Sequence, residues 1–181
     1  MVETASRLFQ RDGYNGTSWR GLVEEAGTPW GSVHHHFPGG KEELGVAAID
    51  FGAEAVTGLI AHCFDSQPDP ASAVREAFRL SALGMEASDY RAACPVASVA
   101  LEVVPDSEPM TTAAGDAFLG WEKLIARRLR DTGIRKKPAR ELARLVLTMF
   151  EGALVLSRIQ RTTVPLEEAG NHLYGVLIGW S

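Results

Sequence analysis

The 181-residue sequence contains only two cysteines, Cys63 and Cys94. Two cysteines cannot form a disulfide framework, so the sequence favours a reducing compartment. There is also no uninterrupted apolar run of about 18 residues, the length that spans a membrane. No signal peptide pattern is visible near the start. We therefore expect a cytoplasmic protein without a membrane partner.

The sequence motifs of common enzyme classes are missing too. No glycine-rich phosphate loop follows a strand, and GxSxG, HExxH and CxxC do not occur. Cys94 could pair with a distant histidine as a nucleophile, but a buried cysteine that packs as a small apolar residue is the simpler explanation. The sequence thus predicts a protein that is not an enzyme and that needs no cofactor.

Positive charge is scarce. The net charge is −5, from 18 Lys and Arg against 23 Asp and Glu. Within residues 1–45, four basic side chains accompany six acidic ones. A nucleic-acid-binding protein normally carries a basic surface, so composition alone does not favour such a partner. If the protein binds DNA, these few cations neutralise few phosphates. The logarithm of the binding constant falls with the logarithm of the salt concentration by about 0.9 per neutralised phosphate, so we expect a shallow salt dependence.

What the sequence does contain is a helix–turn–helix pattern within residues 17–44. Thr17 or Ser18 can cap a first helix, in which apolar residues recur at helical spacing. Trp19 belongs to that buried face, and Gly27 can end the helix in left-handed geometry. One short helix is therefore predicted before the turn.

A second start signal follows the turn. Thr28 is expected to cap the next helix, with Pro29 at its first position, where the missing N–H costs nothing. That helix should end near His36, which we expect to be packed. Two short helices joined by a glycine turn form the unit whose second helix enters the major groove.

Three adjacent histidines, residues 34–36, suggest a metal site at first sight. Consecutive positions point around a helix rather than toward one another. No cysteine or carboxylate completes a tetrahedral set, so no bound metal is expected.

Beyond this motif the pattern remains helical, and no segment alternates like a strand. The sequence predicts an all-α fold: a three-helix DNA-binding domain over residues 1–45 and a larger helical body over residues 46–181. Helices are expected at about residues 41–64, 71–86, 94–103, 108–131, 137–161 and from 165 onward.

The motif residues resemble the tetracycline-repressor (TetR) family of bacterial regulators, most closely over residues 2–49. The similar positions are Ala5, Leu8, Phe9, Gly13, Thr17, Ser18, Ala26, Gly27, Gly31, His35, His36, Phe37, Lys41 and Leu44. The run Phe-Pro-Gly-Gly-Lys-Glu-Glu-Leu at 37–44 and the later Cys94-Pro95-Val96 are similar to the LmrA/YxaF branch. Trp30 and His34 depart from the residues usual in the family, which are polar and tyrosine respectively.

The resemblance implies a ligand-responsive repressor that binds a double-stranded DNA operator and is released by a small, largely apolar effector. Ser32 and Trp30 are candidates for base contacts, and Gly31 lets the helix approach the groove floor. The remaining predicted DNA contacts are phosphate contacts from Thr17, Arg20, His34, His35 and Lys41. Thr17 could instead serve only as a cap.

In the family, the larger helical domain binds its ligand among the middle helices, so the resemblance implies a ligand pocket there. Large or adaptable side chains that could line it are Phe78, Met85, Phe118, Trp121, Met149 and Phe150. Each could equally be ordinary core. Glu102, in an apolar segment, could bind a polar group of the ligand or pair with an arginine from residues 127–144. That basic stretch could be a second nucleic-acid patch, although a solvated helix face explains it as well.

The last two helices, at about 137–161 and 165–180, are expected to form a homodimer. The predicted apolar stripes comprise Leu142, Leu145, Val146, Met149, Ala153, Leu156, Leu173, Val176, Leu177 and Trp180. Alternatively, both stripes face the core of their own chain. A two-fold dimer would recognise a near-palindromic operator. The rival hypothesis is a helical dimer that binds a small molecule or protein and has lost DNA binding, as the acidic N-terminal domain would permit.

Overall fold

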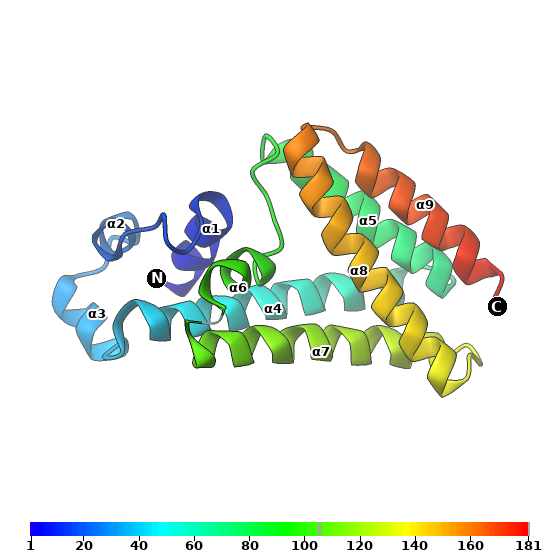
Figure 1. The fold of residues 1–181 in the computed structure, drawn as a ribbon, viewed down its shortest axis with the longest axis horizontal. Coiled ribbons are helices and arrows are strands. Elements are labelled where there is room, and N and C mark those ends of the chain that lie inside the picture. Colours follow the sequence, from blue (N-terminus) through cyan, green and yellow to red (C-terminus); the bar gives the residue numbers. More distant parts are fainter. Residues whose placement is uncertain (105, 181) are drawn as a thin grey trace. The chain divides into compact units, whose positions relative to one another are not determined.

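The computed structural model describes residues 1–104 and 106–180, and this part of the chain contains helices and no strand. The helices are α1 (Val2–Asp12), α2 (Trp19–Glu25), α3 (Trp30–His36), α4 (Gly40–Ser66), α5 (Pro70–Ala87), α6 (Ala97–Val103), α7 (Glu108–Arg130), α8 (Lys136–Gln160) and α9 (Val164–Ile178) (Figure 1). The predicted all-α class is therefore confirmed.

The chain divides into two compact units. The first unit comprises residues 1–55 and 93–117, and the second comprises residues 56–92 and 118–181. Helices α4 and α7 contribute to both units. The domain boundary predicted after residue 45 lies inside α4, which continues through it as one helix.

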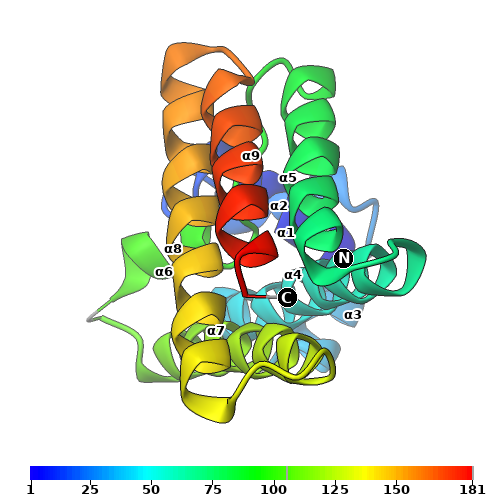
Figure 2. The same ribbon diagram turned by 90° about the vertical axis from the view of Figure 1, so that its right-hand side faces the viewer.

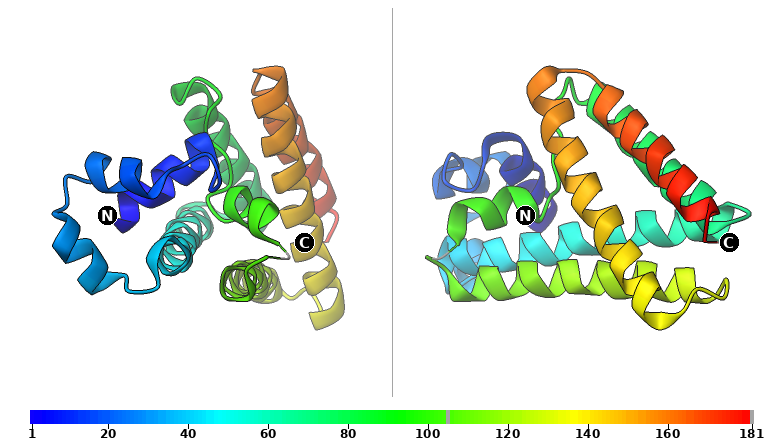
Figure 3. Two further views of the ribbon diagram at one scale, coloured as in Figure 1. Left: turned by 60° about the vertical axis from the view of Figure 1, so that its left-hand side comes forward. Right: turned by 45° about the vertical axis from the view of Figure 1, so that its right-hand side comes forward.

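The first unit contains α1, α2, α3 and α6 together with the N-terminal parts of α4 and α7 (Figure 3). Helix α1 contacts both α2 and α6. The apolar faces of these helices form a buried core, which includes Leu8, Phe9, Leu22, Val23, Val33 and Leu44. Burial of these side chains provides the main stabilisation of helices that are too short to persist alone.

The second unit is built around the packing of α9 against α5 and α8 (Figure 2). Its buried side chains include Phe78, Met85, Trp121, Leu166 and Leu173. The Phe78 and Phe150 rings pack edge to face with centroids 5.1 Å apart, which joins α5 to α8. The Trp121 indole N–H donates to the Thr57 hydroxyl over 3.1 Å, which joins α7 to α4.

The helix start and stop signals are mostly confirmed. Ser18 accepts a hydrogen bond from the Gly21 N–H at 3.0 Å and is the cap of α2. Gly27 has φ = 60°, the left-handed conformation expected after α2. The predicted start of α3 is wrong by one residue, because Pro29 occupies the N-cap position. The Thr28 hydroxyl is directed backward and donates to the Ala26 carbonyl at 3.3 Å.

Helix α4 is the one helix of the described residues that is long and apolar enough to cross a membrane. Its most apolar window has a mean hydropathy of 1.5, although charged residues interrupt it, which is why no continuous apolar run was found in the sequence. A core helix of a soluble protein meets the same criterion, so this one helix is weak evidence for a membrane span.

Candidate DNA interface and ligand pocket

Helix α3 is anchored by one buried side chain and exposes the rest of its surface. Val33 is only 1% exposed, whereas Trp30 is 46% exposed. Gly31, His34 and His35 are also exposed. The turn after α2 and the burial of Val33 together fix which face of α3 is free. Four predicted contact residues thus lie on that exposed face, with Ser32 half-buried beside them.

The prediction that His36 is packed is wrong, because this residue is exposed. Helix α3 ends at His36, and the next residue, Phe37, is half-buried in its place. The Phe37 N–H closes the last turn on the Val33 carbonyl at 2.9 Å. The apolar contact at this end of the helix is therefore made one residue later than expected.

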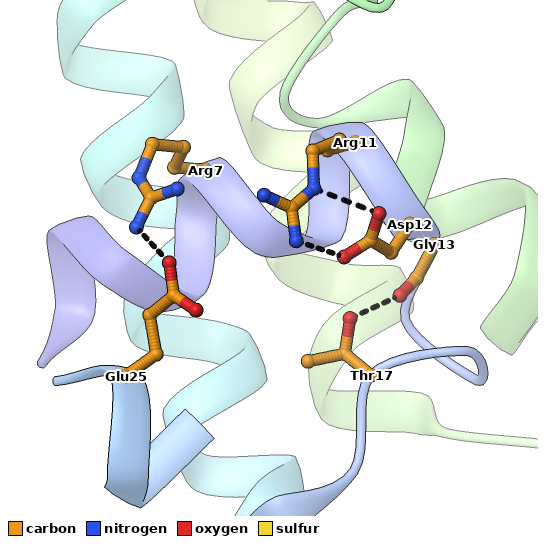
Figure 4. Close-up of polar contacts among 6 residues, drawn as sticks. All are labelled: Arg7, Arg11, Asp12, Gly13, Thr17 and Glu25. Atoms are coloured by element: carbon orange, nitrogen blue, oxygen red, sulfur yellow. Dashed lines mark hydrogen bonds and ion pairs between the residues drawn. The ribbon is translucent and has the colours of Figure 1, made fainter. Parts of the chain in front are cut away.

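Thr17 lies in the turn before α2 and is 5% exposed. Its hydroxyl donates to the Gly13 carbonyl at 2.7 Å (Figure 4). The hydroxyl thus closes the turn between α1 and α2, while its neighbour Ser18 caps α2. A phosphate contact from the Thr17 hydroxyl would require this internal bond to be shared or exchanged.

The arginines of the N-terminal domain are all ion-paired. Arg7 contacts Glu25 at 2.9 Å and Arg11 contacts Asp12 at 2.7 Å (Figure 4). Arg20, whose side chain is 80% exposed, contacts Glu24 at 2.7 Å. Exposed pairs of this kind contribute only about 0–1 kcal/mol and are screened by salt. They can therefore exchange a carboxylate for a phosphate at small cost.

Lys41 lies at the start of α4 and is held by Tyr14. Its ammonium donates to the Tyr14 carbonyl and lies 4.1 Å from the centroid of the Tyr14 ring. Burial lowers the pKa of Lys41, and the nearby Glu102 carboxylate partly opposes that effect. Lys41 therefore stabilises the α1–α2 turn through Tyr14, whether or not it also contacts DNA.

Glu102 is bound by the same turn. Its carboxylate accepts backbone N–H bonds from Tyr14 at 3.1 Å and from Asn15 at 2.8 Å. The expectation that Glu102 pairs with an arginine from residues 127–144 is wrong, because its charge is compensated by these amides. Gly13, with φ = 82°, lies directly against the carboxylate. Sequence patterning gave no signal for this contact, which joins residues 88 positions apart.

The second unit contains a narrow apolar cavity of about 40 Å³ between α4, α5, α7 and α8. Its walls are formed by Val56, Leu59, Ile60, Cys63, Phe64, Val74, Ala77, Phe78, Trp121, Ile125, Val146, Leu147, Phe150 and Glu151. Burial raises the pKa of the Cys63 thiol, which disfavours the thiolate form.

Three of the predicted ligand residues, Phe78, Trp121 and Phe150, meet in this cavity. Phe118 lines a shallower groove next to Glu122 and Arg144. Met85, Met149 and Glu102 are not among the residues that line either space. Cys63, Val74, Ile125 and Val146 were missed, because small apolar residues on a helix carry no signal that distinguishes a cavity wall from ordinary core.

The apolar residues of α8 and α9 divide into a buried set and an exposed set. Leu142, Val146, Ala153, Leu173 and Leu177 are buried within the chain. A different set is exposed and comprises Leu145, Val155, Leu156, Ile159, Val176, Ile178 and Trp180. The expectation that the first five form a subunit interface is therefore wrong, whereas Leu145, Leu156, Val176 and Trp180 are free to do so.

Comparison with known proteins agrees with this geometry. Residues 1–48 match the model of the bacterial regulatory proteins of the tetR family. Residues 70–172 match the C-terminal domain of LmrA/YxaF-like transcriptional regulators. The HTH-type regulator YxaF of Bacillus subtilis is 35% identical over 166 residues, which cover 92% of this chain and 87% of that protein. LmrA of the same species is 32% identical, covering 92% and 88%.

Solved structures show the same fold. A TetR regulator from Legionella pneumophila has a TM-score of 0.85 at 21% identity, covering 97% of this chain and 94% of its own. One from Chloroflexus aurantiacus has a TM-score of 0.80 at 28% identity, covering 98% and 91%.

The chain belongs to the TetR family of transcriptional regulators. Within that family it carries the LmrA/YxaF type of C-terminal domain. Members are HTH-type DNA-binding regulators, typically ligand-responsive repressors, and generally not enzymes.

Proposed function

We propose that this protein is a cytoplasmic, homodimeric repressor that leaves a near-palindromic operator when a small apolar molecule binds its second unit. The observation that carries the proposal is the exposed face of α3, where Trp30, Gly31, His34 and His35 project from a helix anchored by Val33. A helix held in this way can present side chains to base edges in the major groove.

The proposed effector site is the cavity that contains Phe78, Trp121 and Phe150. At about 40 Å³ it is much smaller than the roughly 300–1,000 Å³ of typical ligand pockets. An effector must therefore separate the helices that line the cavity. A ligand that binds only the widened state shifts the population toward it, and this differential affinity is what can release DNA.

The proposed dimer forms through the exposed residues Leu145, Val155 and Leu156 of α8 and Val176 of α9, with Trp180 beyond α9. Several large apolar side chains exposed on two neighbouring helices are costly to leave in water, and such surfaces are typical of subunit interfaces. A two-fold dimer presents two α3 helices to half-sites about 34–36 Å apart, or a multiple of this distance.

The experiment that tests the proposal is selection of bound duplexes from a random DNA pool by the purified dimer at two salt concentrations. Recovery of a palindromic consensus supports the repressor and gives the operator. Because the N-terminal cations are few and paired, the salt dependence should be shallow. The effector is then sought by its ability to release this operator.

One observation favours a second candidate, a ligand- or protein-binding dimer that has lost DNA binding. Arg7, Arg11 and Arg20 are paired with carboxylates and Lys41 with Tyr14, so each basic side chain of residues 1–45 already has a partner. The absence of any enriched duplex, even at low salt, would support this candidate and reject the repressor.

A further inference from the structure

Basic side chains gather in a groove between the end of α7 and the beginning of α8. The groove has a volume of about 370 Å³ and is lined by Leu119, Glu122, Lys123, Ala126, Arg127, Arg130, Lys136 and Arg140. Five cations thus surround one carboxylate in a chain whose net charge is −5. Like charges placed this close repel one another, so their clustering calls for a physical explanation.

The single carboxylate does not neutralise the groove. Glu122 is 8% exposed, and its oxygens accept from Arg140 at 2.7 Å and from Arg144 at 3.1 Å. These bonds hold the pKa of Glu122 below its ordinary value. Both carboxylate oxygens of Glu122 thus accept hydrogen bonds from arginines of α8, which joins α7 to α8.

The remaining four cations are unpaired. Among the described residues, no ion pair or side-chain hydrogen bond is found for Lys123, Arg127, Arg130 or Lys136. The first three recur at positions four and then three apart, so they share one face of α7. Lys136 comes from α8, on the other wall. Their charged groups are thus free to bind a ligand from two sides.

The start of α8 adds a second, independent feature. Helix N-termini carry a partial positive charge that favours acidic residues and disfavours basic ones. Yet the first turn of α8 has no acidic residue and no side-chain cap, and its first position is the groove residue Lys136. Neither capping nor the helix dipole explains this arrangement, whereas an anion bound nearby would offset both sources of positive charge.

We infer that this groove binds a small organic phosphate, a soluble molecule with two or more phosphate charges and an apolar or ring portion. Phosphate oxygens suit the forked donors of Arg127 and Arg130. Leu119 and Ala126 are apolar residues of the groove lining and can contact the remainder of the molecule. The volume falls within the range of small-molecule sites, and a concave site favours a small molecule over the convex surface of duplex DNA.

This site is separate from the apolar cavity, since the two share no lining residue. It therefore concerns a second ligand, of opposite chemical character to the proposed effector. Its test does not depend on operator recognition.

The test uses the full chain and ATP labelled with N-methylanthraniloyl as a fluorescent probe, with binding followed by anisotropy. The variant Arg127→Gln/Arg130→Gln removes two groove cations. The matched control Arg135→Gln/Lys137→Gln removes two cations from the adjoining turn that do not line the groove. Thermal melting of both variants verifies that they are folded.

We expect inorganic pyrophosphate to displace the probe and adenosine to leave it bound. The Arg127→Gln/Arg130→Gln variant should bind the probe about tenfold or more weakly, because it loses charge-assisted hydrogen bonds, whereas the control should change less than about twofold. Equal weakening of both variants would mean attraction to general positive charge and would overturn the proposal. So would the absence of probe binding up to about 1 mM.

Competition also separates the possible sources of phosphate. A short random-sequence duplex or anionic phospholipid vesicles that displace the probe at lower phosphate concentration than pyrophosphate would identify a nucleic-acid or membrane surface instead. Either result would overturn the small-molecule site.

Discussion

The Glu102 carboxylate accepts a hydrogen bond from the backbone N–H of Tyr14 over 3.1 Å, and so connects α6 with the turn that precedes α2. The neighbouring Asn15 N–H donates to the second carboxylate oxygen at 2.8 Å. The Lys41 ammonium donates to the Tyr14 carbonyl. The turn that positions the helix–turn–helix is thus fixed by one acidic and one basic side chain, each from a different helix.

Replacement Glu102→Gln should loosen this turn. A neutral amide oxygen forms weaker hydrogen bonds than a carboxylate, and its NH₂ group cannot accept the second N–H. We expect a loss of about 1–2 kcal/mol in unfolding free energy. Amide hydrogen exchange should accelerate at Tyr14 and Asn15. Glu54→Gln, at an exposed position of α4, is the control, and equal protection of the two amides in both variants would contradict the assigned role.

Base recognition is tested by Trp30→Ala and Ser32→Ala on α3. Both should change which duplexes are selected, because loss of a base contact costs about 1–3 kcal/mol on the preferred sequence only. Lys41→Ala should instead weaken binding similarly on operator and random DNA. If Trp30→Ala reduced affinity equally on both, Trp30 would be excluded from base recognition.

Filling the apolar cavity should block the response to the effector. Ala77→Val adds two methyl groups to a half-buried wall residue, and Ala87→Val adds the same groups at an exposed position of α5. We expect Ala77→Val to change the free energy of unfolding by less than about 1.5 kcal/mol in either direction. It should retain operator binding but require about tenfold more effector for release. A normal response would place the effector elsewhere.

The subunit interface is tested by Leu156→Glu. Leu156 is 48% exposed in the single chain, so a charge there can be tolerated in the monomer but not in a buried interface. Sedimentation should show a folded monomer, and operator affinity should fall because the two α3 helices are no longer linked. Leu83→Glu, at a 50% exposed position of α5, should remain dimeric. If the Leu156→Glu variant still dimerised, the subunit interface would have to lie away from α8.

Acid should weaken the second unit through Glu122. The hydrogen bonds from Arg140 and Arg144 lower the pKa of Glu122 in the folded protein. Its stabilisation is therefore present above the unfolded pKa of about 4.3 and is lost as pH falls through the lower folded value. Because both arginines are largely exposed, we expect only about 1–2 kcal/mol.

Urea unfolding from neutral pH to about pH 3 measures this contribution. Glu122→Gln should be less stable at neutral pH and should lose less stability in acid. Glu141→Gln, which alters an exposed pair with Lys137, should follow the parent protein. An unchanged acid dependence in Glu122→Gln would show that other carboxylates account for the loss.

Local chemistry made much of the fold predictable. Ser18 and Gly27 act within a few residues of their own position, and capping and left-handed geometry follow from those residue types. The boundaries of the long helices agree with prediction to within a few residues for the same reason. The error at Thr28 and Pro29 arose because two adjacent start signals competed, and the helix began after the proline.

The candidate ligand site was harder to predict. Phe78, Trp121 and Phe150 were identified by size, and they do meet in a cavity. Met85 has the same properties but is fully buried elsewhere. Which side of a helix faces a void depends on the packing of four helices, and no periodicity in one segment records it.

The helical class, the caps and turns, and the order of helices that places α3 after a glycine turn could all be predicted from the residues. Those features rest on interactions between residues a few positions apart. Three features became visible only in the folded chain. Glu102 binds the α1–α2 turn, Leu142 and Leu177 are core whereas Leu156 is surface, and Lys136 lines the same groove as Arg127. Each of these depends on contacts between distant segments, whose energies exist only once the chain has folded.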